Sequence, residues 1–194
     1  MRNAEFDKEK VLRSAMNAFM YKGYAKTSMQ DLKKATGLHP GSIYCAFENK
    51  RGLLLASLEQ YRLDRKTEFE LFFSATQPTI ASLKAYLDNI VAECISCDSA
   101  QACLMTKALN EIAEQDEEIQ QVISDNLSLL QQALSGKFEQ AKQEGSIANA
   151  KDCDHLARYF LMGIYGLRTF AHTHPEAKII EQLAKQLYDD ICRE

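Results

Sequence analysis

Apolar residues recur at helical spacing over almost the whole chain, and few residues interrupt them. Only 3 prolines and 8 glycines occur among the 194 residues. The stretches between them place apolar side chains at positions i, i+3 and i+4, with almost no alternation of period two. That spacing gives a helix one apolar face, whereas a half-buried strand needs alternation. The sequence therefore predicts an all-α fold.

Caps and breaks divide the chain into about nine helices. The first is expected to run from an N-cap at Asp7 to a stop at Gly23. A second follows from a Ser28-x-x-Asp31 capping box to Gly37, and a third runs through Pro40, which is tolerated in a first turn. The fourth is expected over about residues 50–72. The later helices are expected to begin after the break at 77–79, at Asp98-Ser99, at Asp116, at Asp152 and at Pro175.

Charge is divided unevenly along the chain. Residues 1–66 carry 13 Lys and Arg against 7 Asp and Glu, whereas residues 67–194 carry 10 against 20. A basic module on an acidic remainder is typical of a protein whose one small part approaches phosphates. The two short helices joined at Gly37 have the size of a helix-turn-helix, although a generic three-helix subdomain would look similar. We expect a DNA-binding domain over residues 1–50, with its motif at about 28–47, and a second domain over residues 51–194.

Several other classes of protein are not indicated. No apolar run approaches the roughly 18 residues of a membrane span, and the N-terminal MRNAEFDKEKVL lacks the apolar core of a signal peptide. We therefore expect a cytoplasmic protein without membrane contact, whose six scattered cysteines are reduced. No catalytic triad, paired carboxylates or glycine-rich phosphate loop is recognisable. We expect no enzymatic activity, no cofactor and no bound metal.

A specific run of residues links the N-terminal third to a known family. The run comprises Thr27-Ser28-Met29-Gln30-Asp31-Leu32, Ala35-Thr36-Gly37-Leu38, Gly41-Ser42-Ile43-Tyr44-x-x-Phe47, Lys50 and Leu53-Leu54. At these positions the chain resembles the TetR/AcrR family of transcriptional regulators. The resemblance is close over about residues 5–55 and otherwise rests on helix number and length. It implies a homodimeric repressor that binds a palindromic operator and is released by a small apolar or reactive ligand in its C-terminal domain.

The predicted DNA contacts gather at helix starts. Thr27 and Ser28 offer hydroxyls and backbone N–H groups, which suit a phosphate. By resemblance, Tyr44 and Lys50 also contact phosphates. Gln30 is expected to add a hydrogen bond to a base. The expected base-reading residues of the third helix offer few hydrogen-bond donors, and they are His39, Pro40, Gly41, Ser42 and Cys45.

The resemblance also assigns a dimer interface and a ligand pocket. The last two helices would form a four-helix bundle with a second copy, the alternative being burial within one chain. The predicted interface residues are Leu156, Phe160, Gly163, Leu167, Ile180, Leu183 and Leu187. The middle helices would carry the pocket, whose predicted residues are Tyr86, Cys103, Met105, Asn110, Phe138, Met162, Tyr165 and Arg168.

The cysteines suggest an alternative kind of sensing. The segment Ala102-Cys103-Leu104-Met105 resembles the Gly-Cys-Leu-Leu segment at the start of helix six in a TetR subgroup, some of whose members respond to electrophiles or oxidants. Cys94 and Cys97 have the spacing of a redox pair. The alternatives are thus a regulator that senses through Cys103 or Cys94/Cys97, a thiol oxidoreductase that binds no DNA, and cysteines that are only structural.

Overall fold

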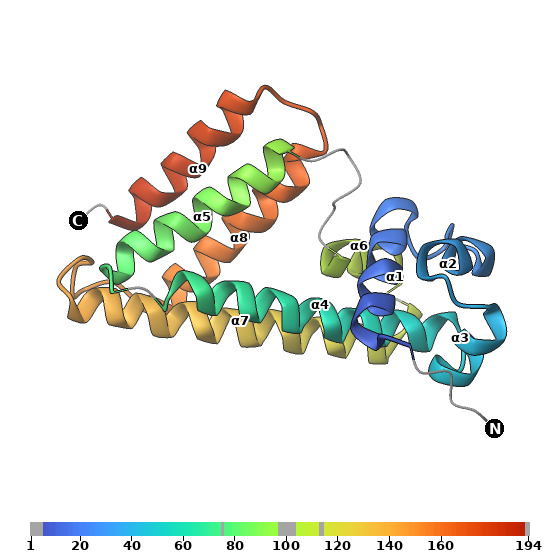
Figure 1. The fold of residues 1–194 in the computed structure, drawn as a ribbon. Coiled ribbons are helices and arrows are strands. Elements are labelled where there is room, and N and C mark those ends of the chain that lie inside the picture. Colours follow the sequence, from blue (N-terminus) through green and yellow to red (C-terminus); the bar gives the residue numbers. More distant parts are fainter. Residues whose placement is uncertain (1–5, 75, 97–103, 113–114, 193–194) are drawn as a thin grey trace. The chain divides into compact units, whose positions relative to one another are not determined.

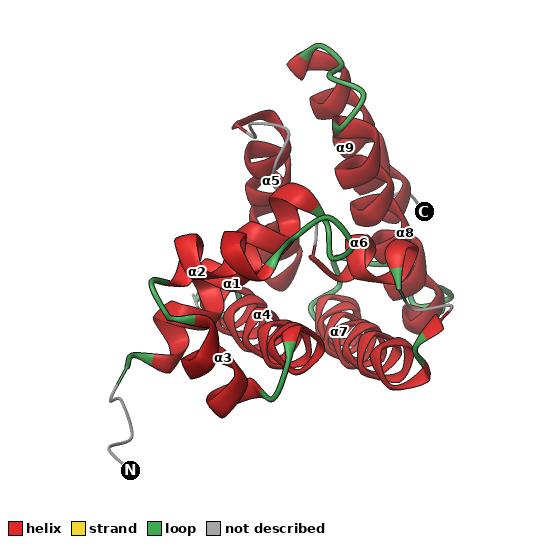
Figure 2. Ribbon diagram, turned by 90° about the vertical axis from the view of Figure 1, so that its right-hand side faces the viewer, coloured by secondary structure: helices red, strands yellow, loops and turns green. Residues whose placement is uncertain are grey.

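The structure is a computed structural model that describes residues 6–74, 76–96, 104–112 and 115–192. Over these residues it contains nine helices and no strand (Figure 1 and Figure 2). The predicted all-α fold is therefore confirmed. The helices are α1 (Lys8–Lys22), α2 (Met29–Thr36), α3 (Pro40–Phe47), α4 (Lys50–Phe72), α5 (Thr79–Ser96), α6 (Leu104–Glu111), α7 (Glu117–Gln143), α8 (Cys153–Ala171) and α9 (Ala177–Cys192).

Local capping explains where several helices begin and end. The Asp7 carboxylate accepts a 3.0 Å hydrogen bond from the backbone N–H of Lys10, which fixes the start of α1. Gly23 ends α1 with a φ of 81°, a conformation that glycine adopts readily. Asp152 caps α8 in the same way as Asp7 caps α1. These predicted boundaries are confirmed, whereas the predicted start at Asp98-Ser99 lies outside the described residues.

The chain forms two compact units. Unit 1 comprises Met1–Arg65 and Asp98–Asp125, and unit 2 comprises Lys66–Cys97 and Asn126–Glu194. The predicted boundary between two domains was residue 50, whereas unit 1 continues to Arg65 and also includes Asp98–Asp125. The reason is that α6 and the start of α7 make hydrogen bonds to the N-terminal helices, among them the pair of Arg51 with Asp116.

The core of unit 1 is built by the first four helices together with α6 and the start of α7, which bury Leu104 and Ile119. Its fully buried side chains include Phe19 of α1, Leu32 of α2, Ile43 of α3 and Leu53 of α4. Burial of one such side chain contributes about 1.5–3 kcal/mol relative to exposure. The core therefore fixes α2 and α3, the two helices of the predicted motif, in one arrangement.

In unit 2, helices α5, α8 and α9 lie side by side (Figure 1). The rings of Phe138 on α7 and Phe160 on α8 meet edge to face, with centroids 5.8 Å apart. Where α8 meets α9, the side chain of Leu187 lies against Gly163, and a Cβ on Gly163 would come within 2.3 Å of a Leu187 methyl. The glycine thus allows close approach of two helices in one chain. Among the described residues, no helix has the length and apolarity to cross a membrane.

Candidate nucleic-acid interface

Helices α2 and α3 are joined by a tight turn, as in a helix-turn-helix. Gly37 ends α2 with left-handed backbone angles, φ 73° and ψ −2°, and its N–H donates to the carbonyl of Lys33. The Thr36 hydroxyl stabilises the turn further, because it donates to the Leu32 carbonyl at 2.6 Å and accepts from the N–H of Leu38 at 3.2 Å. This turn orients α3 relative to α2.

Helix α3 buries one face and exposes the other. Ile43 and Phe47 are buried in the core of unit 1, whereas Tyr44 is 51% exposed and Cys45 is exposed beside it. At the start of α3, His39 acts as the N-cap, and its Nδ1 accepts a 3.3 Å hydrogen bond from the Gly41 N–H. The exposed face therefore includes Tyr44 and Cys45, and His39 is partly engaged in capping.

The structure places the remaining base-reading candidates around the first turn of α3 and the first turn of α2. Gly41 and Gln30 are exposed, while Pro40 and Ser42 are half-buried. A Cβ on Gly41 would meet only the Nδ1 of His39 at 3.6 Å, which is an ordinary contact. Space above Gly41 is thus open to an approaching molecule.

Thr27 lies differently from the prediction. Its side chain is only 1% exposed, and its hydroxyl donates to the Gly23 carbonyl at 2.6 Å. The hydroxyl consequently stabilises the turn between α1 and α2 and is not presented to a phosphate. The neighbouring Ser28 is exposed, but its hydroxyl and its backbone N–H both bond to the carboxylate of Asp31.

The start of α2 carries a carboxylate that is neutralised by a lysine. The ammonium of Lys22 lies 2.6 Å from Oδ1 of Asp31, and this hydrogen bond, together with those from Ser28, holds the pKa of Asp31 well below its usual range. Further positive charge lies nearby on exposed side chains that the sequence analysis did not single out, namely Lys26, Lys33 and Lys34. Their only signal in the sequence was the basic excess of residues 1–66.

The Lys50 side chain lies against the turn between α1 and α2. Its ammonium is 4.3 Å from the centroid of the Tyr24 ring and donates to the Ala25 carbonyl at 3.4 Å. Burial lowers the pKa of Lys50, and the nearby charge of Glu111 opposes that shift. The Lys50 side chain is thus half-buried, and its ammonium is engaged with the protein's own backbone.

The predicted pocket residues are divided between the two units. In unit 2, Tyr86 and Phe138 are buried in the core, Met162 is exposed, and Arg168 is paired with Glu93 at 2.9 Å. The half-buried Tyr165 packs against the same core. In unit 1, Met105 is buried and Asn110 is exposed. Cys103 lies outside the described residues.

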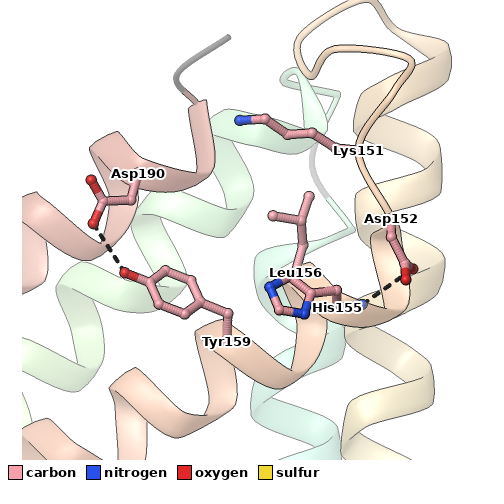
Figure 3. A pocket seen from close by; sticks show the side chains of 6 residues that line it. All are labelled: Lys151, Asp152, His155, Leu156, Tyr159 and Asp190. Carbon is pink, nitrogen blue, oxygen red and sulfur yellow. Dashed lines mark hydrogen bonds between the residues drawn. The ribbon is translucent and has the colours of Figure 1, made fainter.

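A pocket of about 380 Å³ lies elsewhere in unit 2, where the start of α8 meets the end of α9 (Figure 3). The Tyr159 hydroxyl donates to Asp190 at 3.0 Å across it, and Lys151 donates to the Ile191 carbonyl at 2.8 Å. None of the predicted ligand residues lines it. Its lining residues are Lys151, Asp152, His155, Leu156, Tyr159 and Asp190.

Most of the predicted dimer residues lie in the core of the chain itself. The buried ones are Leu156, Phe160, Leu167, Ile180 and Leu187. The space beside Gly163 is filled by the side chain of Leu187 from the same chain. Within the predicted set, only Leu183 is well exposed. The periodicity identified the apolar residues of α8 and α9 but did not separate the inner faces of these helices from their outer faces.

The described cysteines differ in exposure. Cys153 is buried, and burial raises the pKa of its thiol to about 11. Cys94 is half-buried, while Cys97 lies outside the described residues, so the spacing of the predicted pair has no structural counterpart here. The described residues include no cluster of three or more His, Cys, Asp or Glu that could hold a metal ion.

Comparisons with known proteins agree with this geometry. The family profile described as bacterial regulatory proteins, tetR family, matches residues 11–57, and that of the tetracyclin repressor-like C-terminal domain matches residues 79–187. The HTH-type transcriptional repressor ComR of Escherichia coli strain K12 is 28% identical over 182 residues, which is 92% of this chain and 86% of ComR.

Solved structures show the same fold. A TetR transcriptional regulator from Chloroflexus aurantiacus has a TM-score of 0.84 at 22% identity, covering 96% of this chain and 94% of that one. A cysteine variant of the TetR family regulator CifR, solved with a 26-base-pair operator, has a TM-score of 0.82 at 21% identity, covering 97% and 98%. Since the two profiles together match most of the sequence, the chain belongs to the TetR family and is a DNA-binding transcriptional regulator, not an enzyme.

Proposed function

We propose that this protein is a homodimeric repressor that binds a palindromic operator through unit 1 and leaves it when a small apolar or reactive ligand binds. The observation that carries the proposal is the two-sided character of α3. Its inner face, with Ile43 and Phe47, is fixed in the core, while Tyr44 and Cys45 face outward. A short helix held rigidly with a free face is what insertion into a major groove requires.

Two of the proposed DNA contacts follow from exposure: Tyr44 contacts a backbone phosphate, and the open space above Gly41 lets the start of α3 approach the bases. The half-buried Lys50 is proposed as a phosphate contact because of its match to the family pattern, and its ammonium would exchange the Ala25 carbonyl for a phosphate. At the start of α2, the N–H groups of Met29 and Gln30 have no intrahelical partner and suit a phosphate. The exposed lysines Lys26, Lys33 and Lys34 strengthen attraction to DNA in a salt-dependent way.

Dimerisation is proposed through the outer faces of α8 and α9. These faces expose Met162 and Phe170 on α8 and Ile179 and Leu183 on α9. An apolar row on two adjacent helices is suited to an isologous four-helix contact with a second copy. Two copies related by a two-fold axis would present two α3 helices to the two halves of a palindrome.

Repression and ligand release are proposed from the relatives and from unit 2. ComR is named a repressor, and CifR was solved on operator DNA. Tyr86 and Phe138 belong to the apolar core of unit 2, and Arg168 pairs with Glu93 at 2.9 Å; an apolar ligand with one polar group is proposed to bind among these side chains by displacing part of that packing. Release requires the ligand to bind more tightly to the DNA-free state. As an operator-binding protein it would work in the bacterial cytoplasm.

A thiol-responsive regulator is the second candidate. Its support is the sequence of residues 102–105, since Cys103 itself lies outside the described residues. Replacing Cys103 with Ser, and separately Cys94 with Ser, should abolish release by peroxide or an electrophile in one of the two variants. Unchanged release in both would remove this candidate. The oxidoreductase alternative is set aside because the family is one of transcription regulators.

The test is binding of the purified protein to the DNA upstream of its own gene, followed by fluorescence anisotropy over a series of salt concentrations. We expect tight binding that weakens as salt rises. Lys50→Ala should weaken binding and reduce the slope of log K against log salt by about one. Tyr44→Phe should weaken binding by a smaller factor. Undiminished binding by both variants would overturn the docking described above.

A further inference from the structure

Two side chains from α6 hold the turn between α1 and α2. The Lys107 ammonium donates a 2.6 Å hydrogen bond to the Met20 carbonyl and lies 3.5 Å from that of Tyr21. The Glu111 carboxylate accepts a 3.3 Å hydrogen bond from the backbone N–H of Ala25. All five residues belong to unit 1. The turn is therefore held at two points by one distant helix.

The two contacts match the polarity of the turn. The last carbonyls of a helix carry partial negative charge and lack intrahelical partners, so a cation suits the end of α1. A free N–H in the turn suits a carboxylate. Lys107 and Glu111 are one helical turn apart and so lie on the same face of α6, about 6 Å apart along its axis. One face of α6 is thus complementary to the turn.

Gly23 makes room for this arrangement. A Cβ on Gly23 would lie 2.2 Å from Oε1 of Glu111, far inside the contact distance of the two atoms. The backbone of Gly23 also has a φ of 81°, where side chains are unfavourable. Absence of a side chain here lets the carboxylate approach the turn.

The same turn carries the ammonium of Lys50. Lys50 donates to the carbonyl of Ala25, the residue whose N–H donates to Glu111. It also lies over the ring of Tyr24, one residue earlier. A movement of the turn would therefore displace the Ala25 carbonyl and the Tyr24 ring, the two groups that hold the Lys50 ammonium.

We propose that Lys107 and Glu111 are positioning residues for operator binding, which fix the α1–α2 turn and, through it, the Lys50 ammonium that meets a DNA phosphate. The inference rests on the proposed phosphate contact of Lys50.

The first test separates positioning from simple charge. Removing a carboxylate from a DNA-binding protein should, by charge alone, strengthen attraction to phosphates. We expect the opposite for Glu111→Ala, about tenfold weaker operator binding, because the turn loses its hydrogen bond. Glu111→Gln should bind nearly as well as the parent, since its amide oxygen still accepts from Ala25. The matched control is Glu117→Gln, an exposed carboxylate in the first turn of α7.

The second test uses the salt dependence of binding. Lys107→Met keeps the apolar stem and removes the ammonium, so binding should weaken while the slope of log K against log salt stays as in the parent. Lys50→Ala, which removes a phosphate contact, should reduce that slope by about one. A reduced slope for Lys107→Met would mean that Lys107 itself contacts DNA, and it would overturn the positioning role.

The third test needs no DNA. Hydrogen exchange followed by mass spectrometry should show faster exchange of the peptide containing residues 21–28 in Glu111→Ala and Lys107→Met, while peptides of unit 2 exchange as in the parent. Parent-like exchange there, or Glu111→Ala binding as tightly as the parent, would overturn the inference. If the parent protein bound no operator, the proposed function would fail instead, and the exchange result would still decide whether α6 holds the turn.

Discussion

The guanidinium of Arg51 forms a two-pronged hydrogen-bonded pair with the carboxylate of Asp116, in which Nη2 lies 2.8 Å from Oδ1. The same carboxylate caps α7, because it accepts a 3.1 Å hydrogen bond from the N–H of Ile119. Arg51 also lies 2.6 Å from Glu118. The start of α4, where Lys50 lies, is thus attached to the start of α7.

This pair predicts a pH-dependent stability. Hydrogen bonds from Arg51 lower the pKa of Asp116 from 3.8 to about 2. A carboxyl with a depressed pKa in the folded state contributes stability that is present above its unfolded pKa and is lost as the pH falls through the folded value. Asp116→Ala should therefore lower the free energy of unfolding near neutral pH, by about 1 kcal/mol for the cap alone. Urea unfolding between neutral pH and about pH 2 measures this.

The control for Asp116 is Glu117→Ala, which removes a neighbouring carboxylate that does not cap the helix. Its effect should be small at every pH. The difference between Asp116→Ala and the parent should shrink from about pH 4 downward. A difference that stays constant over this range would show that Asp116 acts only through its volume.

Replacement by alanine should have different effects at two glycines of unit 1, Gly41 in α3 and Gly52 in α4. A Cβ on Gly52 would lie 2.0 Å from the backbone oxygen of Phe47, which cannot move without displacing the end of α3. Gly52→Ala should destabilise unit 1 by about 1–3 kcal/mol and impair DNA binding. Gly41→Ala meets no close neighbour, so its thermal midpoint should match the parent.

The operator affinity of Gly41→Ala tests whether Gly41 allows close approach of α3 to the bases. If the start of α3 approaches the bases closely, Gly41→Ala binds several-fold more weakly in anisotropy measurements despite its native stability. Parent-like affinity of this variant would move the close approach to another part of α3.

Much of the fold could be predicted because its signals are local. Asp7, Ser28 and Asp152 are caps that act on N–H groups two or three residues away, so the sequence around each one contains the whole interaction. The position of α3 followed equally from Pro40, which is tolerated in a first turn.

Contacts between distant segments could not be predicted. Nothing near Arg51 marks Asp116 as its partner, and nothing near Ala25 marks Glu111, because such pairs depend on how whole helices pack. Thr27 shows a related difficulty: a threonine before a helix can face a phosphate or bond backward, and here it bonds to Gly23. The helical period also could not decide which apolar residues of α8 and α9 face inward.

The thiols should differ sharply in reactivity. Burial raises the pKa of Cys153 to about 11, so this thiol stays protonated and covered at about pH 8. Cys45 is exposed on α3. Brief treatment of the native protein with iodoacetamide, followed by peptide mass spectrometry, should find label on Cys45 and almost none on Cys153. Labelling in urea should reach both, and equal labelling in the native protein would contradict the burial of Cys153.

The packing of α8 on α9 gives a second pair of matched glycines. Gly163→Ala would bring a Cβ within 2.3 Å of the buried Leu187 side chain, whereas a Cβ on Gly166 meets nothing within 4 Å. We expect Gly163→Ala to destabilise unit 2 by about 1–3 kcal/mol and Gly166→Ala to be neutral or stabilising by up to about 1 kcal/mol. Thermal unfolding compares them directly. If Gly166→Ala instead disrupted only the dimer, α8 would meet the second copy at that position.

The proposed dimer face on α8 and α9 can be tested by introducing a charge at Leu183. Leu183 is 46% exposed on the outer side of α9, and Leu71 is 67% exposed on α4. In an isologous contact, Leu183→Glu would bring two carboxylates into an apolar interface, so the dissociation constant of the dimer should rise by about 100-fold or more. Leu71→Glu adds the same charge away from α8 and α9 and should leave the dimer intact. Light scattering after size exclusion reports the mass of each variant, and a dimeric Leu183→Glu protein would place the interface on another face.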